Sequence, residues 1–356
     1  MGNLNFYRDE PIFGLDIGHS SLKAVQIQKA AGKQPVVLGY GVGQFPPDAI
    51  QNGEIVKPQA IAEAMHQLFE KNLVGSITSK RVACSLPTSH TFSRPMKVPP
   101  MEHHEILESI QLEAEQYIPV PITNLYLDYE VSNQDAQGME LLLVAASKKI
   151  IDSYLKTLQS LNLEPLVFEP SIMAASRLLR SIGEAGSEPS ILVDLGSVTT
   201  DIALYDKTLL VASTINEGGD DMTRLISSSL HMGLDQAEEI KRQHGIGYSD
   251  KQQRVIDALR PQLENLVHEI QKSIRYYSER TANSGKKISQ IITVGGGAIM
   301  PGFNHYLSLE LRLPTHSLEP WQTISFGNLA VPAEADRSMY ITAAGEAILD
   351  PLEATT

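Results

Sequence analysis

The chain has 356 residues, 42% hydrophobic and 20% charged, an ordinary globular composition that is long enough for two domains. Its formal net charge of −13 disfavours nucleic acid or an anionic lipid surface as the main partner. The single cysteine, Cys84, excludes an intrachain disulfide and fits a reducing cytoplasm. There is no signal-peptide pattern, and the longest apolar run, Leu141 to Ala146, is far shorter than the ~20 residues of a spanning helix. We expect a soluble protein.

The first predicted element is a β-hairpin over residues 12–28, in which an apolar strand ends near Asp16 and a second strand returns with Lys23. Glycine lets the backbone approach a ligand closely, and successive turn N–H groups form a concave site for anions. Lys23 could reach back toward a phosphate bound over the turn. A common Asp-x-Gly turn is the alternative reading. The residues that would bind phosphate here are Gly18, Ser20, Ser21 and Lys23.

Alternating strands and helices follow, which favours α/β architecture. Pro58 opens an amphipathic helix. From Arg81 to about Pro165 the pattern indicates a small inserted α+β subdomain with helices over 102–117 and 149–161. The strands expected in it cover residues 81–87, 91–98, 126–131 and 139–146.

The hairpin pattern is repeated around residues 191–204, where Asp194 takes the place of Asp16. This repeat suggests two similar halves. Two such hairpins facing one another could hold a polyphosphate from both sides, with the carboxylates near its metal ion. The phosphate-binding residues of the second copy would be Gly196, Ser197 and Thr199.

Two glycines, Gly218 and Gly219, lie between a strand over 209–215 and a helix over 221–230. They are either a simple turn with Asp220 as the N-cap, or a helix N-terminus whose free N–H groups face phosphates. In the next helix, Glu238 and Lys241 are one turn apart. They form an ordinary surface pair or hold a ribose or adenine.

A long helical stretch over 255–277 contains Pro261, which we expect to kink or split it. A buried strand over 288–294 then leads into three glycines. The dinucleotide-binding fingerprint fails because Met300 occupies the third glycine position, and no Walker-type loop is present. The triple glycine instead allows the backbone to lie flat against a base, through Gly295, Gly296 and Gly297.

Taken in order, these segments resemble the actin-like ATPase superfamily. The resemblance implies an α/β actin-like ATPase fold, in which two domains of related topology surround a nucleotide cleft and a small subdomain is inserted. The implied parts are a first domain (1–80), the insert (81–165), a connecting helix (166–188), a second domain (189–335) and a C-terminal helix returning to the first domain (336–356).

The resemblance also implies the ligands, ATP or ADP with Mg²⁺. Asp16 and Asp194 would hold the magnesium through water, which suits an ion that keeps much of its hydration shell. Glu169 falls where related proteins place a residue that orients the attacking water, although it could equally cap the helix beginning at Pro170. ATP hydrolysis is expected to be slow or absent. The remaining implied contacts are Gly218 and Gly219 near phosphates and ribose, Glu238 and Lys241 near ribose and base, and Gly295 to Gly297 under the adenine.

Two stretches are more specific, residues 13–27 (FGLDIGHSSLKAVQI) and 110–122 (IQLEAEQYIPVPI). They resemble the PilM family of type IV pilus assembly proteins. This implies a cytoplasmic ATP-binding scaffold, attached peripherally to the inner membrane, that binds the N-terminal peptide of a PilN-like membrane protein in a groove of the 81–165 region. Other pilus platform or motor proteins are further possible partners. The alternatives are an FtsA-like filament-forming cell-division protein and a sugar-kinase or polyphosphatase-type phosphotransferase.

Overall fold

The computed structural model describes residues 11–30, 32–135, 138–182, 188–247, 250–282 and 285–350. The chain divides into two compact units. The first unit contains residues 1–178, 321–331 and 342–356, and the second contains residues 179–320 and 332–341. Among the helices that the structure describes, none combines the length and the apolar character needed to cross a membrane.

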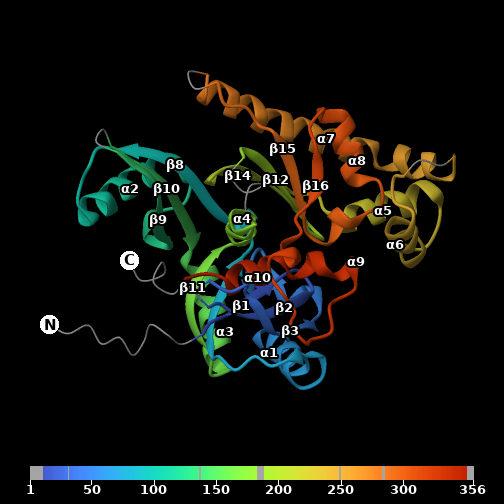
Figure 1. Ribbon diagram of the computed structural model, residues 1–356, viewed down its shortest axis with the longest axis horizontal. Helices are drawn as coiled ribbons and strands as arrows, with labels where there is room; N and C mark the ends of the chain where they lie inside the picture. The colour runs from blue at the N-terminus through green and yellow to red at the C-terminus, as the bar shows by residue number, and fades with distance from the viewer. Residues whose placement is uncertain are drawn as a thin grey trace. The chain divides into compact units, whose positions relative to one another are not determined.

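The first unit is built on a six-stranded sheet in the order β11-β7-β1-β2-β3-β6 (Figure 1). Its central strand β1 pairs antiparallel with β2 and parallel with β7. The strands are β1 (Phe13–Ile17), β2 (Ser21–Gln28), β3 (Val36–Gln44), β6 (Val74–Gly75), β7 (Arg81–Leu86) and β11 (Glu164–Pro170), beside a two-stranded ribbon of β4 (Ile50–Gln51) and β5 (Glu54–Ile55).

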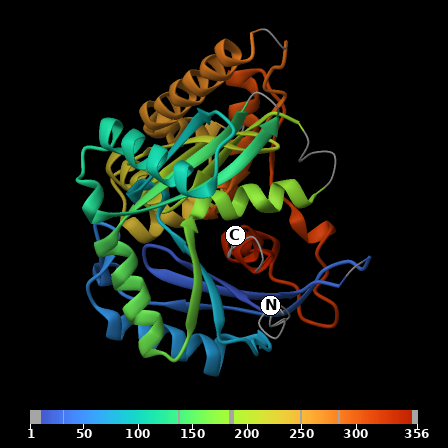
Figure 2. The same cartoon turned by 90° about the vertical axis from the view of Figure 1, so that its left-hand side faces the viewer.

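Helices cover both faces of this sheet (Figure 2). On one face, α1 (Pro58–Gln67) and α3 (Lys148–Ser160) pack on Phe13 and Leu15 in one apolar core. On the other face, α10 (Ile341–Ala347) lies directly on β1, because a Cβ atom at Gly14 would be 1.9 Å from the Ala343 carbonyl oxygen. Side chains alternate between the faces of a strand, so Asp16 projects on the same side as α10.

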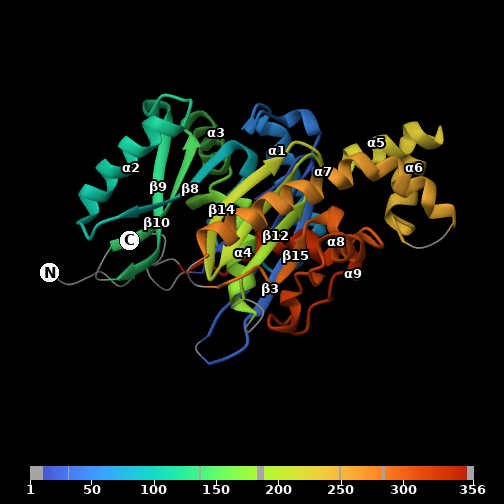
Figure 3. The ribbon, with the colours of Figure 1, turned by 90° about the horizontal axis from the view of Figure 1, so that it is seen from above.

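A smaller sheet belongs to the same unit, with strand order β8-β10-β9. The helix α2 (His103–Tyr117) lies along it (Figure 3) and buries Ile110 and Ala114 against Leu141 and Leu143. Its strands are β8 (Thr91–Val98), β9 (Leu125–Asp135) and β10 (Gly138–Ser147).

The predicted helices and strands of the 81–165 region are confirmed as elements, but they do not all belong to the smaller sheet. The strand β7 pairs with β1, and α3 packs on the core of the six-stranded sheet. The separate sheet with its helix therefore spans residues 91–147. A buried strand with apolar residues on both faces fits the middle of a parallel array, which is where β7 lies.

The second unit repeats the arrangement of the first, with strand order β14-β13-β12-β15-β16. Its central strand β12 pairs antiparallel with β13 and parallel with β15, as β1 pairs with β2 and β7. The expected two domains of related topology are confirmed. The strands are β12 (Ser190–Leu195), β13 (Thr200–Asp206), β14 (Thr208–Ile215), β15 (Gln290–Val294) and β16 (Thr315–Ser317), and the helices are α5 (Gly219–Leu230), α6 (Leu234–Gln243), α7 (Asp250–Arg280), α8 (Phe303–Leu311) and α9 (Glu334–Arg337).

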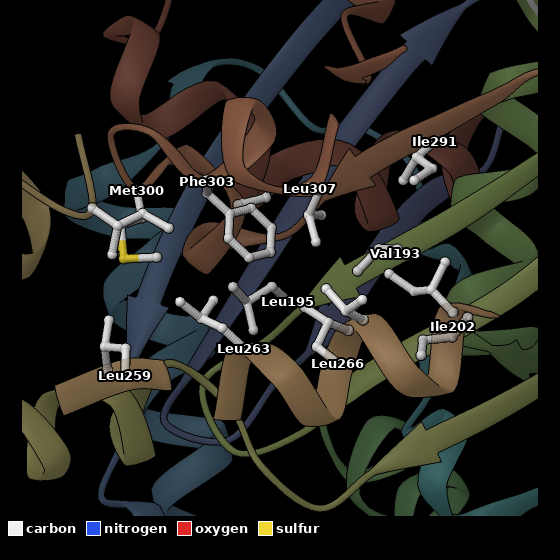
Figure 4. Close-up of a cluster of buried hydrophobic side chains, with 14 of the residues drawn as sticks. Val193, Leu195, Ile202, Leu259, Leu263, Leu266, Ile291, Met300, Phe303 and Leu307 are labelled. Carbon is white, nitrogen blue, oxygen red and sulfur yellow. The ribbon is translucent and has the colours of Figure 1, made fainter. Parts of the chain in front are cut away.

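The long helix α7 continues through Pro261, so the expected split of this helix is wrong. Proline removes a single backbone donor and crowds the preceding turn, and this is tolerated where packing holds both sides. Here Leu259, Leu263 and Leu266 are buried against β12 and α8 in the core shown in Figure 4.

Candidate functional site

The first turn (residues 18–21) joins β1 to β2 and is closed by a 2.9 Å hydrogen bond from the Gly18 N–H to the Ser21 carbonyl. In the described part of the chain, the N–H groups of His19 and Ser20 make no backbone hydrogen bond. They are therefore available to an anion, as in the concave backbone sites that bind phosphate.

Two charged side chains flank this turn. Asp16 lies opposite Lys23 in the hairpin register, with 3.3 Å between the Lys23 Nζ and the carboxylate. The Ser85 hydroxyl donates a 2.8 Å hydrogen bond to the other carboxylate oxygen. A Cβ atom at Gly18 would be 3.2 Å from the Lys23 Nζ, so the ammonium lies over the glycine. The lysine that the sequence places near the turn does lie beside it.

The second turn (residues 196–199) has the same closure, a 3.0 Å hydrogen bond from the Gly196 N–H to the Thr199 carbonyl. The position matching Lys23 is held by Asp201, which pairs with Asp194 across the hairpin and is buried. Sequence reasoning did not select Asp201. The signal was present, because Asp201 follows Asp194 at the same spacing that separates Lys23 from Asp16.

The start of α5 corrects one expectation, since its first N–H groups are not free. The Gly219 N–H donates to the Gly196 carbonyl at 2.9 Å, the Asp220 N–H donates to the Ser197 carbonyl at 2.8 Å, and the Gly218 N–H donates to the Asp221 carboxylate at 2.9 Å. The Gly219 and Asp220 donors hold the second turn. The N-cap residue is Gly218 and not Asp220. A Cβ atom at Gly218 would lie 2.4 Å from the Ser197 carbonyl oxygen, so this position favours glycine.

At the second turn, the backbone donors that remain are those of Ser197 and Val198, which make no backbone hydrogen bond within the residues described. Both residues are exposed. The turn therefore presents a short run of unpaired N–H groups, supported from behind by α5, and this arrangement suits an anion.

Lys241 is buried and does not form an ordinary surface pair. Its ammonium donates at 2.8 Å to the Gly219 carbonyl, at 2.8 Å to the Thr223 hydroxyl, and contacts the Glu238 carboxylate at 2.7 Å. Burial alone would raise the pKa of Glu238, but the hydrogen bonds from Lys241 and Thr223 lower it. This network ties α6 to the first turn of α5, and one edge of Glu238 stays exposed.

The glycine loop (residues 295–297) lies at the end of β15 beside Asp194. Gly295 has a φ of +86°, and a Cβ atom there would lie 2.3 Å from the Asp194 carboxylate. Gly297 packs on the Leu195 side chain, since a Cβ atom at Gly297 would lie 2.5 Å from the Leu195 Cγ. Gly296 has nothing within 4 Å of its Cβ position, so it is the glycine of the loop that a ligand could approach.

Glu169 lies in β11 and is 7% exposed. Both carboxylate oxygens accept from the Arg177 guanidinium, at 2.5 and 2.6 Å. Burial disfavours the charged arginine, yet the paired Glu169 carboxylate raises its pKa overall. At the start of α4 (Ser171–Ser181), the Ile172 N–H donates to the Thr88 hydroxyl at 3.3 Å, while the Glu169 oxygens are held by Arg177.

Each unit has one aspartate beside its turn that could face a magnesium ion, Asp16 in the first unit and Asp194 in the second. Among the described residues, no three acidic, histidine or cysteine side chains are gathered to hold a metal. Each hairpin offers a carboxylate next to a turn with free N–H groups. This fits Mg²⁺, which usually keeps several waters and is held by one or two carboxylates with substrate phosphates.

The fold and the paired hairpins define the class of protein, an actin-like ATPase fold. The structure matches MreB 5 of Spiroplasma citri bound to AMPPNP with a TM-score of 0.53 and 12% identity, covering 95% of both chains. It matches a PilM-PilN type IV pilus biogenesis complex with a TM-score of 0.80 and 24% identity, covering 98% of this chain and 99% of that one.

The particular family follows from the sequence match. A family model described as type IV pilus assembly protein PilM covers residues 14–350, and the chain belongs to this family. The cell division protein FtsA of Bacillus subtilis (strain 168) is 22% identical over 341 residues, covering 83% of this chain and 75% of that protein. FtsA of Enterococcus hirae is 27% identical over 268 residues, and the alignment spans 67% of this chain and 58% of that relative.

Proposed function

We propose that this protein is an ATP-binding scaffold of a type IV pilus assembly platform that binds a PilN-like membrane protein. The observation that carries the nucleotide part is the repeated hairpin, each copy with a glycine-closed turn, free N–H groups and an adjacent aspartate. Membership of the PilM family carries the pilus part.

In the second unit, the proposed phosphate ligands are the N–H group and hydroxyl of Ser197 and the hydroxyl of Thr199, with Gly196 closing the turn. Gly219 contributes by donating to this turn and Gly218 by packing closely on it, and neither N–H group is proposed to donate to phosphate. Glu238 and Lys241 support the ribose side, and Gly296 offers the open backbone for the base, flanked by Gly295 and Gly297. Each assignment rests on the local contacts described above.

In the first unit, the proposed phosphate ligands are Gly18, Ser20, Ser21 and Lys23. The Lys23 ammonium, held over Gly18 by Asp16, is a cation that a phosphate would attract. Asp16 and Asp194 are the proposed water-mediated ligands of magnesium, which would neutralise part of the polyphosphate charge when bound.

ATP turnover is proposed to be slow or absent. Glu169 is the acidic residue that the resemblance assigns to water positioning, and both its oxygens are bound by Arg177. The charge-assisted hydrogen bonds of a bidentate pair with arginine are strong and fix the carboxylate in place. Orienting water would require this pair to open.

The proposed partner surface is the 91–147 region. Five of the twelve exposed large apolar side chains found among the described residues lie in this region, and exposed apolar surface is what a partner peptide would cover. The match to a PilM-PilN complex supports a PilN-like peptide as the occupant, and a peripheral inner-membrane location would follow from that partner. The exposed residues are Phe92, Leu112, Tyr117, Tyr126 and Val131.

The nucleotide and partner parts need separate tests. Thermal unfolding is measured with and without Mg-ATP, since binding to the native state raises apparent stability by about 2.7 kcal/mol at a ligand concentration of 100 Kd. The proposal predicts a shift for the wild type that Asp194→Asn reduces, while Glu115→Gln, at an exposed site on α2, keeps it. Equal melting temperatures with and without nucleotide would reject ATP binding.

Partner binding is measured by titrating an N-terminal PilN-type peptide labelled with a fluorophore. Phe92→Ser is expected to weaken binding without changing the Mg-ATP shift. Nucleotide-dependent polymers in negative-stain images, without peptide binding, would favour the FtsA-like alternative. Rapid ATP turnover that depends on an added acceptor would favour the phosphotransferase.

A further inference from the structure

A buried acidic side chain on α10 has no role in the nucleotide or partner sites. Glu346 is 0% exposed, and in the described part of the chain neither of its carboxylate oxygens accepts a hydrogen bond from any donor. An isolated buried carboxylate is very costly, so such a group normally gains a partner or a proton.

The neighbouring groups indicate whether Glu346 gains a charged partner or a proton. Glu169 on β11 neighbours Glu346 and already accepts two hydrogen bonds from Arg177 on α4. The same guanidinium donates to the carbonyl of Gly345, the residue before Glu346. Asp16 on β1 and the buried Cys84 thiol on β7 are the other titratable groups that act on it. Of the two buried carboxyl groups, Arg177 therefore binds only that of Glu169. Two carboxylates cannot hydrogen-bond each other without a proton between them.

Backbone packing prevents water from relieving this charge. Gly14 of β1 lies against α10, where a Cβ atom would be 1.9 Å from the Ala343 carbonyl oxygen. Gly345 lies against α4, where a Cβ atom would be 2.1 Å from the Ala174 carbonyl oxygen. The Arg177 guanidinium also donates to the Gly345 carbonyl at 3.1 Å. The helix is therefore in close backbone contact with β1 and with α4, and the Glu346 side chain is wholly buried.

We propose that Glu346 is a neutral carboxylic acid at neutral pH, that it donates its proton to Glu169, and that this proton holds α10 against β1 and α4. The charges then balance, with Arg177 positive, Glu169 negative and Glu346 uncharged. The strand under the helix carries Asp16 two residues beyond Gly14, so the proton stabilises the support of the first turn. Burial, and then the neighbouring Glu169 charge, raise the pKa of Glu346 well above its usual range, in keeping with this geometry.

The sign of the pH effect follows from that direction. A group with a raised pKa in the folded state binds more protons there than in the unfolded chain. Its stabilisation is complete below the unfolded pKa of about 4.3 and is lost as the pH rises toward the folded pKa. In this window, the folding equilibrium constant falls about tenfold per pH unit for this one group.

The first test is infrared spectroscopy of the full-length protein labelled with ¹³C-glutamate. The wild type at pH 7 is expected to show the carbonyl band of a protonated glutamic acid, identified by its isotope shift. Glu346→Gln should remove this band, and Glu115→Gln should keep it. Absence of a protonated glutamate band from the wild type would overturn the proposal without reference to any variant.

The second test is urea unfolding of wild type and Glu346→Gln between pH 5 and pH 8. The amide is an uncharged isostere that can donate to Glu169, so the variant is expected to fold. The ratio of its folding equilibrium constant to that of the wild type should rise about tenfold per pH unit until Glu346 ionises in the folded wild type. A ratio of folding constants that does not change with pH would overturn the proposal. Because neither measurement uses nucleotide, their outcome is independent of ATP binding.

Discussion

The substitution Gly295→Ala tests how the glycine loop holds Asp194. An alanine would keep a φ of +86°, and its Cβ would lie 2.3 Å from the Asp194 carboxylate and 2.6 Å from the Leu195 carbonyl oxygen. With a ψ of 163°, this backbone conformation is one that essentially only glycine adopts, and it costs a residue with a Cβ about 1–3 kcal/mol. Overpacking against backbone that cannot move away adds about 1–3 kcal/mol. We expect the free energy of unfolding to fall by about 2–6 kcal/mol.

The same substitution should also weaken nucleotide binding, because the contacted atom belongs to Asp194. Urea unfolding measures the loss of stability, and the thermal shift with Mg-ATP measures binding. Gly296→Ala is the matched control for stability, since its Cβ would meet nothing within 4 Å and its φ is not positive. We expect the control to change stability by less than about 0.5 kcal/mol. If both alanine variants unfold alike, the close approach of Gly295 to Asp194 is refuted.

Four further predictions follow from single contacts. Lys241→Met removes three buried interactions and should cost about 1–3 kcal/mol in urea unfolding, and an unchanged midpoint would contradict the network. Glu238 has a lowered pKa, so its stabilisation should be present above the unfolded value and be lost as pH falls; Glu238→Gln should abolish that acid loss in a pH series. Asp194→Asn should reduce the Mg-ATP thermal shift while leaving the nucleotide-free melting temperature within a few degrees, and a full shift would exclude it from magnesium binding. Arg177→Met removes the cation that binds the buried Glu169 carboxylate and should cost about 3–5 kcal/mol, a loss that the additional change Glu169→Gln should partly reverse; additive losses would argue against the ion pair.

Local sequence patterns predicted most of the elements, because strand and helix periods depend on neighbours in the chain. The strands on either side of Asp16 and Asp194 follow from apolar runs that end in glycine turns, and both turns close as such sequences allow. The helix over residues 103–117 follows from its apolar spacing and the proline after it. The extent of the smaller sheet could not be predicted from these patterns, since the sequence pattern of a buried strand such as β7 is the same whichever sheet the strand joins.

The roles of individual polar groups were less predictable. The sequence pattern at Gly218 and Gly219 predicts a helix start that faces phosphate. In the structure the Gly219 N–H holds the second turn, and the Gly218 N–H binds the Asp221 carboxylate. Glu346 lies in an unremarkable AAGEA segment that gives no sign of a fully buried acid. Its partner Glu169 is far away in sequence, and no periodic pattern links the two.

The sequence by itself determined the two hairpins, their glycines and aspartates, and the family to which the chain belongs. It did so because turn geometry and strand register depend on a few consecutive residues. Only the tertiary structure decided which donors stay free at the turns, that Arg177 binds both oxygens of Glu169, and that Glu346 has no polar donor among the described residues. Those outcomes depend on desolvation and on hydrogen bonds between distant segments, and these exist only when the chain is folded.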